Sequence, residues 1–494
     1  MSSQIGITGF QPSVSRSPAE LFLVPQTERR PNSGRFRSRV AIAEAVVDFG
    51  AVIAAVMFSY VLYYHLGVGK HLYYPHRVVL GVSASLAGAI VLMLDRVGTY
   101  SGGTSLLRVR ETEHLLRASV QALGIAFAVS FFTNFLFSRW LLVLTLVLLP
   151  LLLITEKFLV FKFVQWMHAK GHGIERVLIY GSGATGRRVY SVLSRSPKLG
   201  LEPVALIDEN PAKAGSAVFE LGYERRRACT VIRGPLTSEL VKRFAADLVV
   251  IAIPSLAPHK FHNIVREVAA AKASVSFVPN HLMQSEYAVE FRDIDGVMLA
   301  SVNEKPRRLT YEWAKRVLDC AGAAVLFVLC LPLFFVFTIL IHLDSKGSAL
   351  FRQERIGING RRFRMFKFRT MYCDAPAYAY SPQAPHDPRI TRIGRFLRRT
   401  SLDEIPQLLN VLEGSMSLVG PRPEMPFIVE GYEDVHRQRL QVKPGITGLW
   451  QLSGDRAYQI HENIDYDLYY IRNRNLFMDL AILLHTTIFA MRGV

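Results

Sequence analysis

Asp403 and Glu404 stand side by side in the stretch RRTSLDEIPQLLN, after a pair of arginines and just before a proline. Ser401 and Glu404 have the spacing of a capping box, which satisfies free amides at the start of a helix. Pro406 argues against a helix that starts at Ser401, because its missing N–H would fall inside that helix. A helix that begins near Pro406 and ends at Gly414 places both carboxylates in the preceding turn. On these residues alone, capping and function remain equally open.

Cations surround this pair in the sequence. Residues 351–400 hold twelve Lys or Arg residues against three acids, interleaved with Phe and Ile. Such clusters bind either anionic lipid or phosphates. Arg422 follows between two prolines in LVGPRPE, and VKPGITGLWQ carries Lys443 in another rigid turn. Because proline fixes φ, the Arg422 guanidinium is held on a stiff backbone and loses little entropy when it binds an anion.

The composition indicates that the chain is associated with a membrane. The 494-residue chain is 50% hydrophobic, has a positive mean hydropathy of +0.22 and carries a formal charge of +18. This balance is too apolar for an ordinary soluble enzyme and suits an anionic lipid surface or anionic substrates. No nucleic-acid-binding module is recognisable, so nucleic acid is not an expected partner. The four cysteines form no CxxC pair, which favours a reducing compartment.

Four apolar stretches predict a transmembrane region over residues 41–165, after a basic cytoplasmic segment over 1–40. They cover about 41–66, 78–94, 115–137 and 141–164, each near the ~20 residues that a spanning helix needs. Glu44 and Asp48 lie in the first stretch, where we expect them to face other helices or the interface. The arginines that precede this stretch favour a cytoplasmic N-terminus.

Alternating strands and helices follow over residues 173–305 and predict a Rossmann-like, doubly wound α/β domain. The stretch ERVLIYGSGATGRRVYSVL reads as strand, glycine turn and helix, with Gly181, Gly183 and Gly186 in a G-x-G-x-x-G pattern. Asp208 ends the next strand, where such a fold places its ribose-binding acid. Nucleotide binding and simple strand–helix packing both explain these glycines. In either case, a side chain at Gly183 is expected to crowd the turn.

The apolar segment 320–343 is long enough to span a membrane but contains Pro332 at its middle. A spanning helix would place the rest of the chain outside the cell. If the proline breaks the helix, the segment returns to the face that it entered from, as a re-entrant element. The residues alone leave these two topologies nearly even. Lys315 and Arg316, just before the segment, are expected to contact lipid headgroups.

The motifs after residue 311 together resemble bacterial polyprenyl-phosphate sugar-1-phosphate transferases. They are DSKGSALFRQERIG, FKFRTM, DPRITRIGRFLRRTSLDEIPQLLNVL, MSLVGPRPE and VKPGITGLWQ, in that order. The layout of four spans, a Rossmann-like domain and a catalytic module is similar to the large members of this family, the undecaprenyl-phosphate glucose or galactose phosphotransferases. The resemblance implies that residues 306–494 form a small α/β catalytic domain with a re-entrant membrane helix that breaks near Pro332.

The resemblance also implies roles for the site residues. Asp403 and Glu404 would be the catalytic pair, in which Asp403 attacks a UDP-hexose, UMP leaves, and the phosphosugar passes to undecaprenyl phosphate. Glu404 would bind Mg²⁺. An attack on an anionic phosphorus needs cations nearby. The candidates for phosphate binding, with Arg369 and Arg422 foremost, are Lys367, Arg369, Arg392, Arg395, Arg398 and Arg422.

The family also implies a location: the bacterial inner membrane, against its phospholipid, with the catalytic domain on the cytoplasmic face. The pathway would be the start of exopolysaccharide, capsule or O-antigen synthesis. The oligomeric state stays open, a homo-oligomer included. The chain departs from the family pattern at Lys346, Ser348, Ser415 and Arg474-Asn475. Because of the change at Arg474, a preference for one hexose cannot be carried over from the family to this chain.

Two other classes of protein compete with this interpretation. A membrane-bound NAD-dependent nucleotide-sugar dehydratase or epimerase would share the first half of the chain. Tyr311 and Lys315 match its YxxxK pair, although they directly precede an apolar helix. A non-catalytic scaffold for glycan assembly would use the membrane and Rossmann-like parts alone. The intact Asp403–Glu404 pair in its motif argues against the scaffold.

Overall fold

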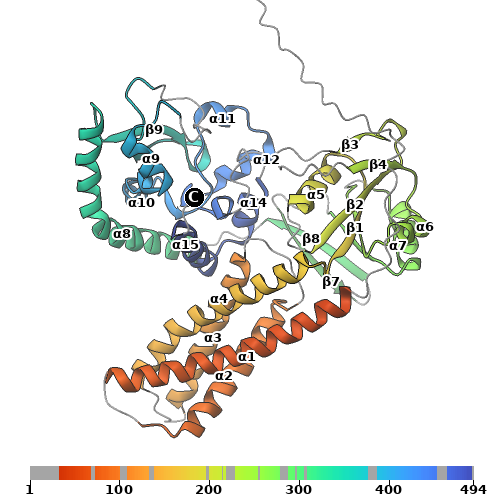
Figure 1. The fold of residues 1–494 in the computed structure, drawn as a ribbon, viewed down its shortest axis with the longest axis horizontal. Helices are drawn as coiled ribbons and strands as arrows, with labels where there is room; N and C mark the ends of the chain where they lie inside the picture. Colours follow the sequence, from red (N-terminus) through yellow and green to blue (C-terminus); the bar gives the residue numbers. More distant parts are fainter. Residues whose placement is uncertain are drawn as a thin grey trace, which may run out of the picture. The chain divides into compact units, whose positions relative to one another are not determined.

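The computed structural model describes residues 33–67, 73–100, 108–132, 138–195, 200–213, 215–218, 229–253, 256–278, 287–294, 297–304, 309–375, 387–452 and 464–491. Most of the basic segment 1–40 therefore lies outside the described residues. The described chain forms two compact units (Figure 1). One unit comprises residues 33–40 and 160–304, and the other comprises residues 41–159 and 305–494. The catalytic motifs all belong to the second unit.

The first part of the chain is helical, because its long apolar stretches are not interrupted by polar segments. They are α1 (Ser33–Leu66), α2 (His76–Arg96), α3 (Val109–Phe132) and α4 (Arg139–Ala169). Their shared core contains Val52, Ile90 and Leu149. Asp48 is fully buried: its Oδ2 atom lies 2.8 Å from Lys157 Nζ and accepts a 2.6 Å hydrogen bond from the Tyr100 hydroxyl. The expectation that Asp48 faces other helices is confirmed.

Four of the described helices are long and apolar enough to cross a membrane. They are Phe36–Leu66, His76–Arg96, Trp140–Ala169 and Leu309–Asp344. Three of them correspond to predicted spans. The third predicted span begins within α3, which is not among these four, and its last residues, 133–137, lie outside the described chain. The fourth candidate is the helix that contains Pro332.

A parallel sheet with helices on its faces follows, as predicted. The sheet order is β3-β4-β2-β1-β5-β6, in which only the β3 edge is antiparallel. Buried aliphatic residues form a separate core on each face of the sheet. The strands are β1 (Glu175–Tyr180), β2 (Leu201–Asp208), β3 (Ala217–Val218), β4 (Cys229–Arg233), β5 (Leu248–Ile251) and β6 (Ser274–Phe277). The helices are α5 (Ala184–Arg195), α6 (Ser238–Arg243) and α7 (Pro258–Ala270). An antiparallel hairpin, β7 (Tyr287–Ile294) with β8 (Val297–Glu304), comes after it.

The long helix α8 (Leu309–Asp344) holds Pro332 in its interior and is visibly bent in Figure 1. Both of its ends contact the same downstream domain. Near its start, Arg316 donates hydrogen bonds to the carbonyls of Val411 and Leu412 at 2.6 and 2.9 Å. At its end, Asp344 accepts a 2.9 Å hydrogen bond from the Ile393 amide. A straight helix of 36 residues would separate its ends by about 54 Å, so the bend brings both ends to one domain.

The downstream domain is small and is built from two short sheets among short helices. Its strands are β9 (Leu350–Ile356), β10 (Arg362–Phe368), β11 (Ser417–Val419) and β12 (Gly445–Thr447). Its main helices are α9 (Arg392–Arg399), α10 (Gln407–Glu413), α14 (Ile464–Asn473) and α15 (Leu476–Met491). The shorter helices are α11 (Pro426–Glu430), α12 (Asp434–Arg437) and α13 (Leu449–Leu452). Strands β9 and β10 form an antiparallel hairpin, whereas β11 and β12 pair in parallel.

Candidate active site

The Asp403–Glu404 pair lies in a 3₁₀ turn, Leu402–Glu404, directly before α10. Helix α10 begins after Pro406 and ends at Gly414, whose φ of 98° is the left-handed conformation that favours glycine. This is the arrangement that the proline and glycine predicted. The Ser401 side chain makes no capping hydrogen bond to this turn. The capping-box interpretation of the pair is therefore wrong, and the carboxylates are available for other contacts.

Lys367 on β10 joins the two carboxylates. Its Nζ atom lies 2.8 Å from Glu404 Oε1 and 3.8 Å from Asp403 Oδ2. Arg422 contacts the same oxygen, with Nη2 at 3.5 Å from Glu404 Oε1. Lys367, Glu404 and Arg422 line one pocket, together with Arg355 and Gln407. The site is thus a cationic pocket around one carboxylate, with Asp403 beside it.

Asp403 is only 9% exposed, and burial raises its pKa above the ordinary value for an aspartate. Lys367 opposes that shift most strongly, Glu404 adds to it by like-charge repulsion, and Arg398 and Arg422 also lower the pKa. The cations therefore offset part of the desolvation that disfavours the ionised form.

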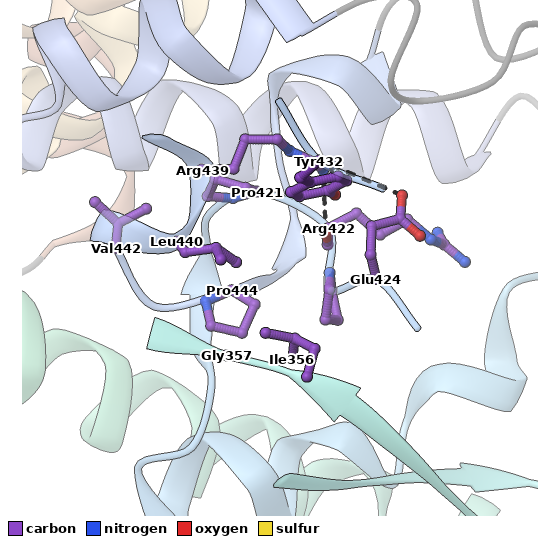
Figure 2. Close-up of a pocket in the computed structure, with 11 residues that line it drawn as sticks. Ile356, Gly357, Pro421, Arg422, Glu424, Tyr432, Arg439, Leu440, Val442 and Pro444 are labelled. Carbon is purple, nitrogen blue, oxygen red and sulfur yellow. Dashed lines mark hydrogen bonds and ion pairs between the residues drawn. The ribbon is translucent and has the colours of Figure 1, made fainter. Parts of the chain in front are cut away.

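Backbone amides and arginine side chains bind the carbonyls of the loop that carries Arg422, and Figure 2 shows Arg439 beside this loop. Because Pro421 and Pro423 have no N–H, this loop offers mainly carbonyl acceptors. Gly445 N donates to the Pro421 carbonyl at 2.9 Å, and Ile356 N donates to the Glu424 carbonyl at 3.0 Å. Arg439, which is buried, and Arg355, which is half-buried, supply further donors.

These two arginines bind consecutive carbonyls of the loop. Arg439 Nη2 donates to the Arg422 carbonyl, and Arg355 Nη1 donates to the Pro423 carbonyl, both at 3.1 Å. Arg439 is 4% exposed and is itself paired with Asp467 at 2.7 Å. The loop that carries Arg422 is therefore preorganised, as the two prolines predicted. The side chains that hold it, Arg355 and Arg439, come from other parts of the sequence.

Three of the six predicted phosphate-binding cations come together at the pair: Lys367, Arg398 and Arg422. Arg398 approaches from α9 and donates a 2.8 Å hydrogen bond to Thr370 Oγ1. Arg369 is turned elsewhere, with Nη2 bound to the carbonyl and hydroxyl of Ser345 at 2.7 and 2.8 Å.

The structure does not bring the other two predicted cations, Arg392 and Arg395, to the pair. Both are exposed on α9, near the exposed ring of Phe396. A cationic face with an aromatic side chain suits a lipid surface better than a buried phosphate pocket.

Arg355 and Arg439 were missed by the sequence analysis. Arg355 stands in QERIG and Arg439 in a stretch without a visible pattern. The only signal for Arg355 was the high arginine content of its segment. That content does not predict which arginine lines a pocket and which contacts lipid. Arg439 could be found only from its buried partners, Asp467 and Tyr432.

The glycine turn of the Rossmann-like domain has a different chemistry. Asp208 Oδ2 accepts hydrogen bonds from the Ser182 amide at 2.9 Å and the Ser182 hydroxyl at 2.8 Å, and Lys213 Nζ lies 3.2 Å away. Asp208 Oδ1 accepts a bond from the Asn210 amide at 2.9 Å. These bonds, acting against desolvation, lower the pKa of Asp208 to about 2. Three protein donors therefore contact Oδ2 and one contacts Oδ1.

The three glycines of the turn have unequal roles. A Cβ atom on Gly186 would lie 1.8 Å from the Gly181 carbonyl oxygen, and one on Gly181 would meet Ile253 at 2.6 Å. A Cβ on Gly183 would come no nearer than 4.0 Å, to Lys213 Nζ. The expectation that Gly183 is the crowded position is therefore wrong, and the close strand–helix contact is at Gly186.

This difference predicts the effect of alanine at two positions. Gly186→Ala should destabilise the Rossmann-like domain by about 3 kcal/mol, because the new methyl group overlaps backbone that cannot move aside. Gly183→Ala should leave stability within about 0.5 kcal/mol of the wild type. Thermal unfolding of the purified variants measures both, and equal melting temperatures would contradict the assignment.

The Tyr311–Lys315 pair lies in the second unit, within a buried cluster. The Tyr311 hydroxyl and Lys315 Nζ contact Asp479 Oδ2 at 2.8 and 3.1 Å, and Asp319 lies 3.7 Å from Lys315. Lys315 and Arg316 are therefore internal contacts, and the expectation that they reach lipid headgroups is wrong. Because both side chains are bound to Asp479 in this buried cluster, the pair gives no support to a dehydrogenase.

The departures at residues 474 and 475 also have structural roles. Arg474 pairs with Glu312 at 2.7 Å. Asn475 accepts a 3.0 Å hydrogen bond from the Met478 amide at the start of α15. Its amide group also donates to Glu113 of α3 at 2.8 Å. These contacts stabilise helix ends and helix packing.

Comparison with known proteins agrees with this arrangement. The family model described as bacterial sugar transferase matches residues 310–493, and the model described as CoA-binding domain matches residues 96–279. An undecaprenyl-phosphate galactose phosphotransferase of Salmonella typhimurium is 30% identical over 72% of this chain and 75% of its own length. An uncharacterized sugar transferase of Haemophilus influenzae is 30% identical over 86% of this chain and 91% of its own length. A UDP-glucose:undecaprenyl-phosphate glucose-1-phosphate transferase of Escherichia coli is 28% identical over 65% of this chain and 68% of its own length.

A chain with membrane-length helices and a carboxylate pair among half-buried cations has the features of a membrane enzyme that acts on phosphate groups. The match of the sugar transferase model to the whole catalytic domain fits that class. The chain belongs to the bacterial sugar transferase family.

Proposed function

We propose that this enzyme transfers a hexose-1-phosphate from a UDP-hexose to undecaprenyl phosphate and releases UMP, as a first step of polysaccharide synthesis. The relatives named above include enzymes for galactose and glucose phosphate transfer to this lipid. The observation that carries the proposal is the pair of Asp403, which is buried, and Glu404, which is half-buried, bridged by Lys367 next to Arg422. A carboxylate can approach an anionic phosphorus only where such cations offset the repulsion.

The proposed reaction has two displacements at one phosphorus atom. First, an Asp403 carboxylate oxygen bonds to the sugar-linked phosphorus, and the bond from that phosphorus to the bridging oxygen breaks. The electron pair leaves with UMP, and a phosphosugar remains on Asp403. Second, a phosphate oxygen of undecaprenyl phosphate attacks this phosphorus and breaks its bond to Asp403. The carboxylate is restored, so no net proton change is required of the pair.

Magnesium is the proposed cofactor, and the donor set fits it. Mg²⁺ is usually bound through one or two carboxylates together with substrate phosphates and waters. Among the described residues, no group of three or more His, Cys, Asp or Glu side chains forms an all-protein metal site. Glu404 in the cationic pocket would supply the carboxylate, and the bound ion would reduce the negative charge of the donor diphosphate.

The functional test is a panel of UDP-hexoses assayed with purified enzyme, undecaprenyl phosphate and Mg²⁺. UMP release that requires the lipid, for at least one hexose, is the expected result. A change in the absorbance of bound nicotinamide on addition of a UDP-hexose would favour the dehydratase alternative. A folded enzyme that releases UMP with none of the UDP-hexoses would contradict the proposal.

We also propose that α8 is re-entrant and that the catalytic domain faces the cytoplasm. Support comes from the contact of both ends of α8 with one domain, and a UDP-sugar donor requires this orientation. Cys373, which is exposed on the catalytic domain, is a natural reporter once Cys229, Cys320 and Cys330 are replaced by serine. An impermeant maleimide should label it in inside-out vesicles and leave it unlabelled in intact spheroplasts.

Labelling of Cys373 in intact spheroplasts would show that α8 spans the membrane. Pro332→Leu restores the missing N–H and should favour a straight helix. This variant should therefore lower UMP release and move Cys373 toward the outer face in part of the molecules. A Leu333→Ala variant, which alters an exposed apolar neighbour in the same helix, serves as the control.

A further inference from the structure

We propose that Arg355 is a second guanidinium of the donor site and binds the phosphate that leaves with UMP, an assignment that rests on the proposed function. Arg355 lies near the end of β9 and lines the same pocket as Lys367, Glu404 and Arg422. Nothing in its sequence motif assigns it to a ligand. Its place in the site follows from the fold alone.

The orientation of Arg355 is fixed by the protein. Its Nε and Nη2 atoms donate to Gln353 Oε1 at 3.2 and 2.7 Å, and its Nη1 atom donates to the Pro423 carbonyl at 3.1 Å. These bonds use three of the five N–H groups of a guanidinium. The side chain therefore reaches the pocket in one orientation, and it retains donors for a phosphate oxygen.

The order of charges along the site selects which phosphate Arg355 meets. Lys367 lies 3.8 Å from Asp403 and 2.8 Å from Glu404, and Arg422 lies 3.5 Å from Glu404. Arg355 binds the Pro423 carbonyl, one residue after Arg422, and lines the pocket with Glu404 and Arg422. Along these contacts Lys367 is the cation beside Asp403, and Arg355 lies at the Arg422 end of the pocket. The phosphorus under attack must lie at Asp403, so the second phosphate of the diphosphate, which belongs to UMP, lies toward Arg355.

The electrostatics of Arg355 agree with an anionic partner. Burial, followed by repulsion from Arg422, lowers the pKa of Arg355 to about 10. Arg355 and Arg422 line one pocket, and an anion between the two guanidiniums would relieve their mutual repulsion. Phosphate accepts such charge-assisted hydrogen bonds from arginine in a bidentate manner.

The test uses the phosphosugar-loaded enzyme, which can react in two directions. UMP drives it back to UDP-hexose, whereas undecaprenyl phosphate drives it forward. Arg355→Lys and Arg355→Gln should slow the reaction with UMP by about 10- to 100-fold, the effect of one charged hydrogen bond. The reaction with undecaprenyl phosphate should change less than threefold. Calorimetry should show UMP binding weakened by a similar factor, and this measurement needs no turnover.

Two control variants distinguish phosphate binding by Arg355 from a role in holding the loop that carries Arg422. Arg352→Gln removes the same charge from an exposed position of β9 and should leave both directions unchanged. Arg439→Lys loosens the Arg422 carbonyl and should slow both directions alike. If the Arg355 variants also slow both directions equally, or bind UMP as tightly as the wild type, Arg355 merely supports the loop and the proposal is wrong. A wild-type enzyme that binds UMP but transfers no hexose phosphate would instead contradict the proposed function.

Discussion

Asp403→Asn is expected to lower UMP release by several orders of magnitude, to the background of the assay. Asparagine has nearly the same size and hydrogen-bonding reach as aspartate, so the buried turn should keep its shape. The amide is a very poor nucleophile toward phosphorus, so the first displacement stops. Mass spectrometry after incubation with UDP-hexose, without lipid, should show a phosphohexose on the wild-type Asp403 peptide and none on the variant.

Glu404→Gln is the matched control, because Glu404 is the carboxylate that lines the pocket and contacts Lys367. We expect a smaller loss, which high Mg²⁺ reduces if Glu404 mainly binds the ion. A phosphohexose on Glu404, or substantial turnover in Asp403→Asn, would show that Asp403 is not the nucleophile. Fragmentation of the peptide that contains both residues locates the phosphohexose, and UMP release measures the turnover.

The same Asp403→Asn variant should be more stable than the wild type at neutral pH. Because burial raises the pKa of Asp403 in the folded state, the folded protein binds its proton more tightly than the unfolded chain does. Above the folded pKa, the ionised carboxylate therefore destabilises the folded state. Asparagine carries no charge, so the variant does not pay the free-energy cost of burying one. The difference in melting temperature should shrink as the pH falls through the folded pKa. A variant that melts below the wild type at pH 7 would contradict this reasoning.

Lys367→Gln should cause the second-largest loss, about 100- to 1,000-fold in kcat. Lys367 is the cation nearest both carboxylates, at 2.8 and 3.8 Å, and it most strongly opposes the raised pKa of Asp403. Without it, Asp403 should hold its proton to a higher pH. The acid limb of the pH–rate profile should therefore move upward. A profile measured by rapid quench of the first displacement reports this shift directly.

Arg364→Gln provides the comparison for Lys367, since it removes a cation from the exposed side of the same strand. Its activity and pH profile should stay close to those of the wild type. If Lys367→Gln lost activity with an unchanged acid limb, Lys367 would act on the substrate alone. The idea that it tunes Asp403 would then be abandoned.

Local patterns predicted much of the fold. Parallel strands buried in the sheet read as continuous aliphatic runs, so β1, β2 and β5 were visible in the sequence. Strand β6 lies at the edge of the sheet and most of its residues are exposed. Pro406 and Gly414 located α10 and placed the carboxylate pair in the turn before it. These signals work because φ restrictions and side-chain periodicity act within a few residues. Strands β3 and β4 lie beside a segment without such a pattern, and they were missed.

The sequence by itself determined which groups are available for chemistry here: a carboxylate pair before a proline, a stiff arginine loop and an excess of cations. Only the tertiary structure decided which cations serve the pair. Arg369 and Lys367 are two residues apart on one strand segment, yet Arg369 binds Ser345 whereas Lys367 bridges Asp403 and Glu404. The reason is physical. A charge acts through distance and burial, and for residues such as Arg355, about 50 positions from Glu404, both quantities are set only when the chain has folded.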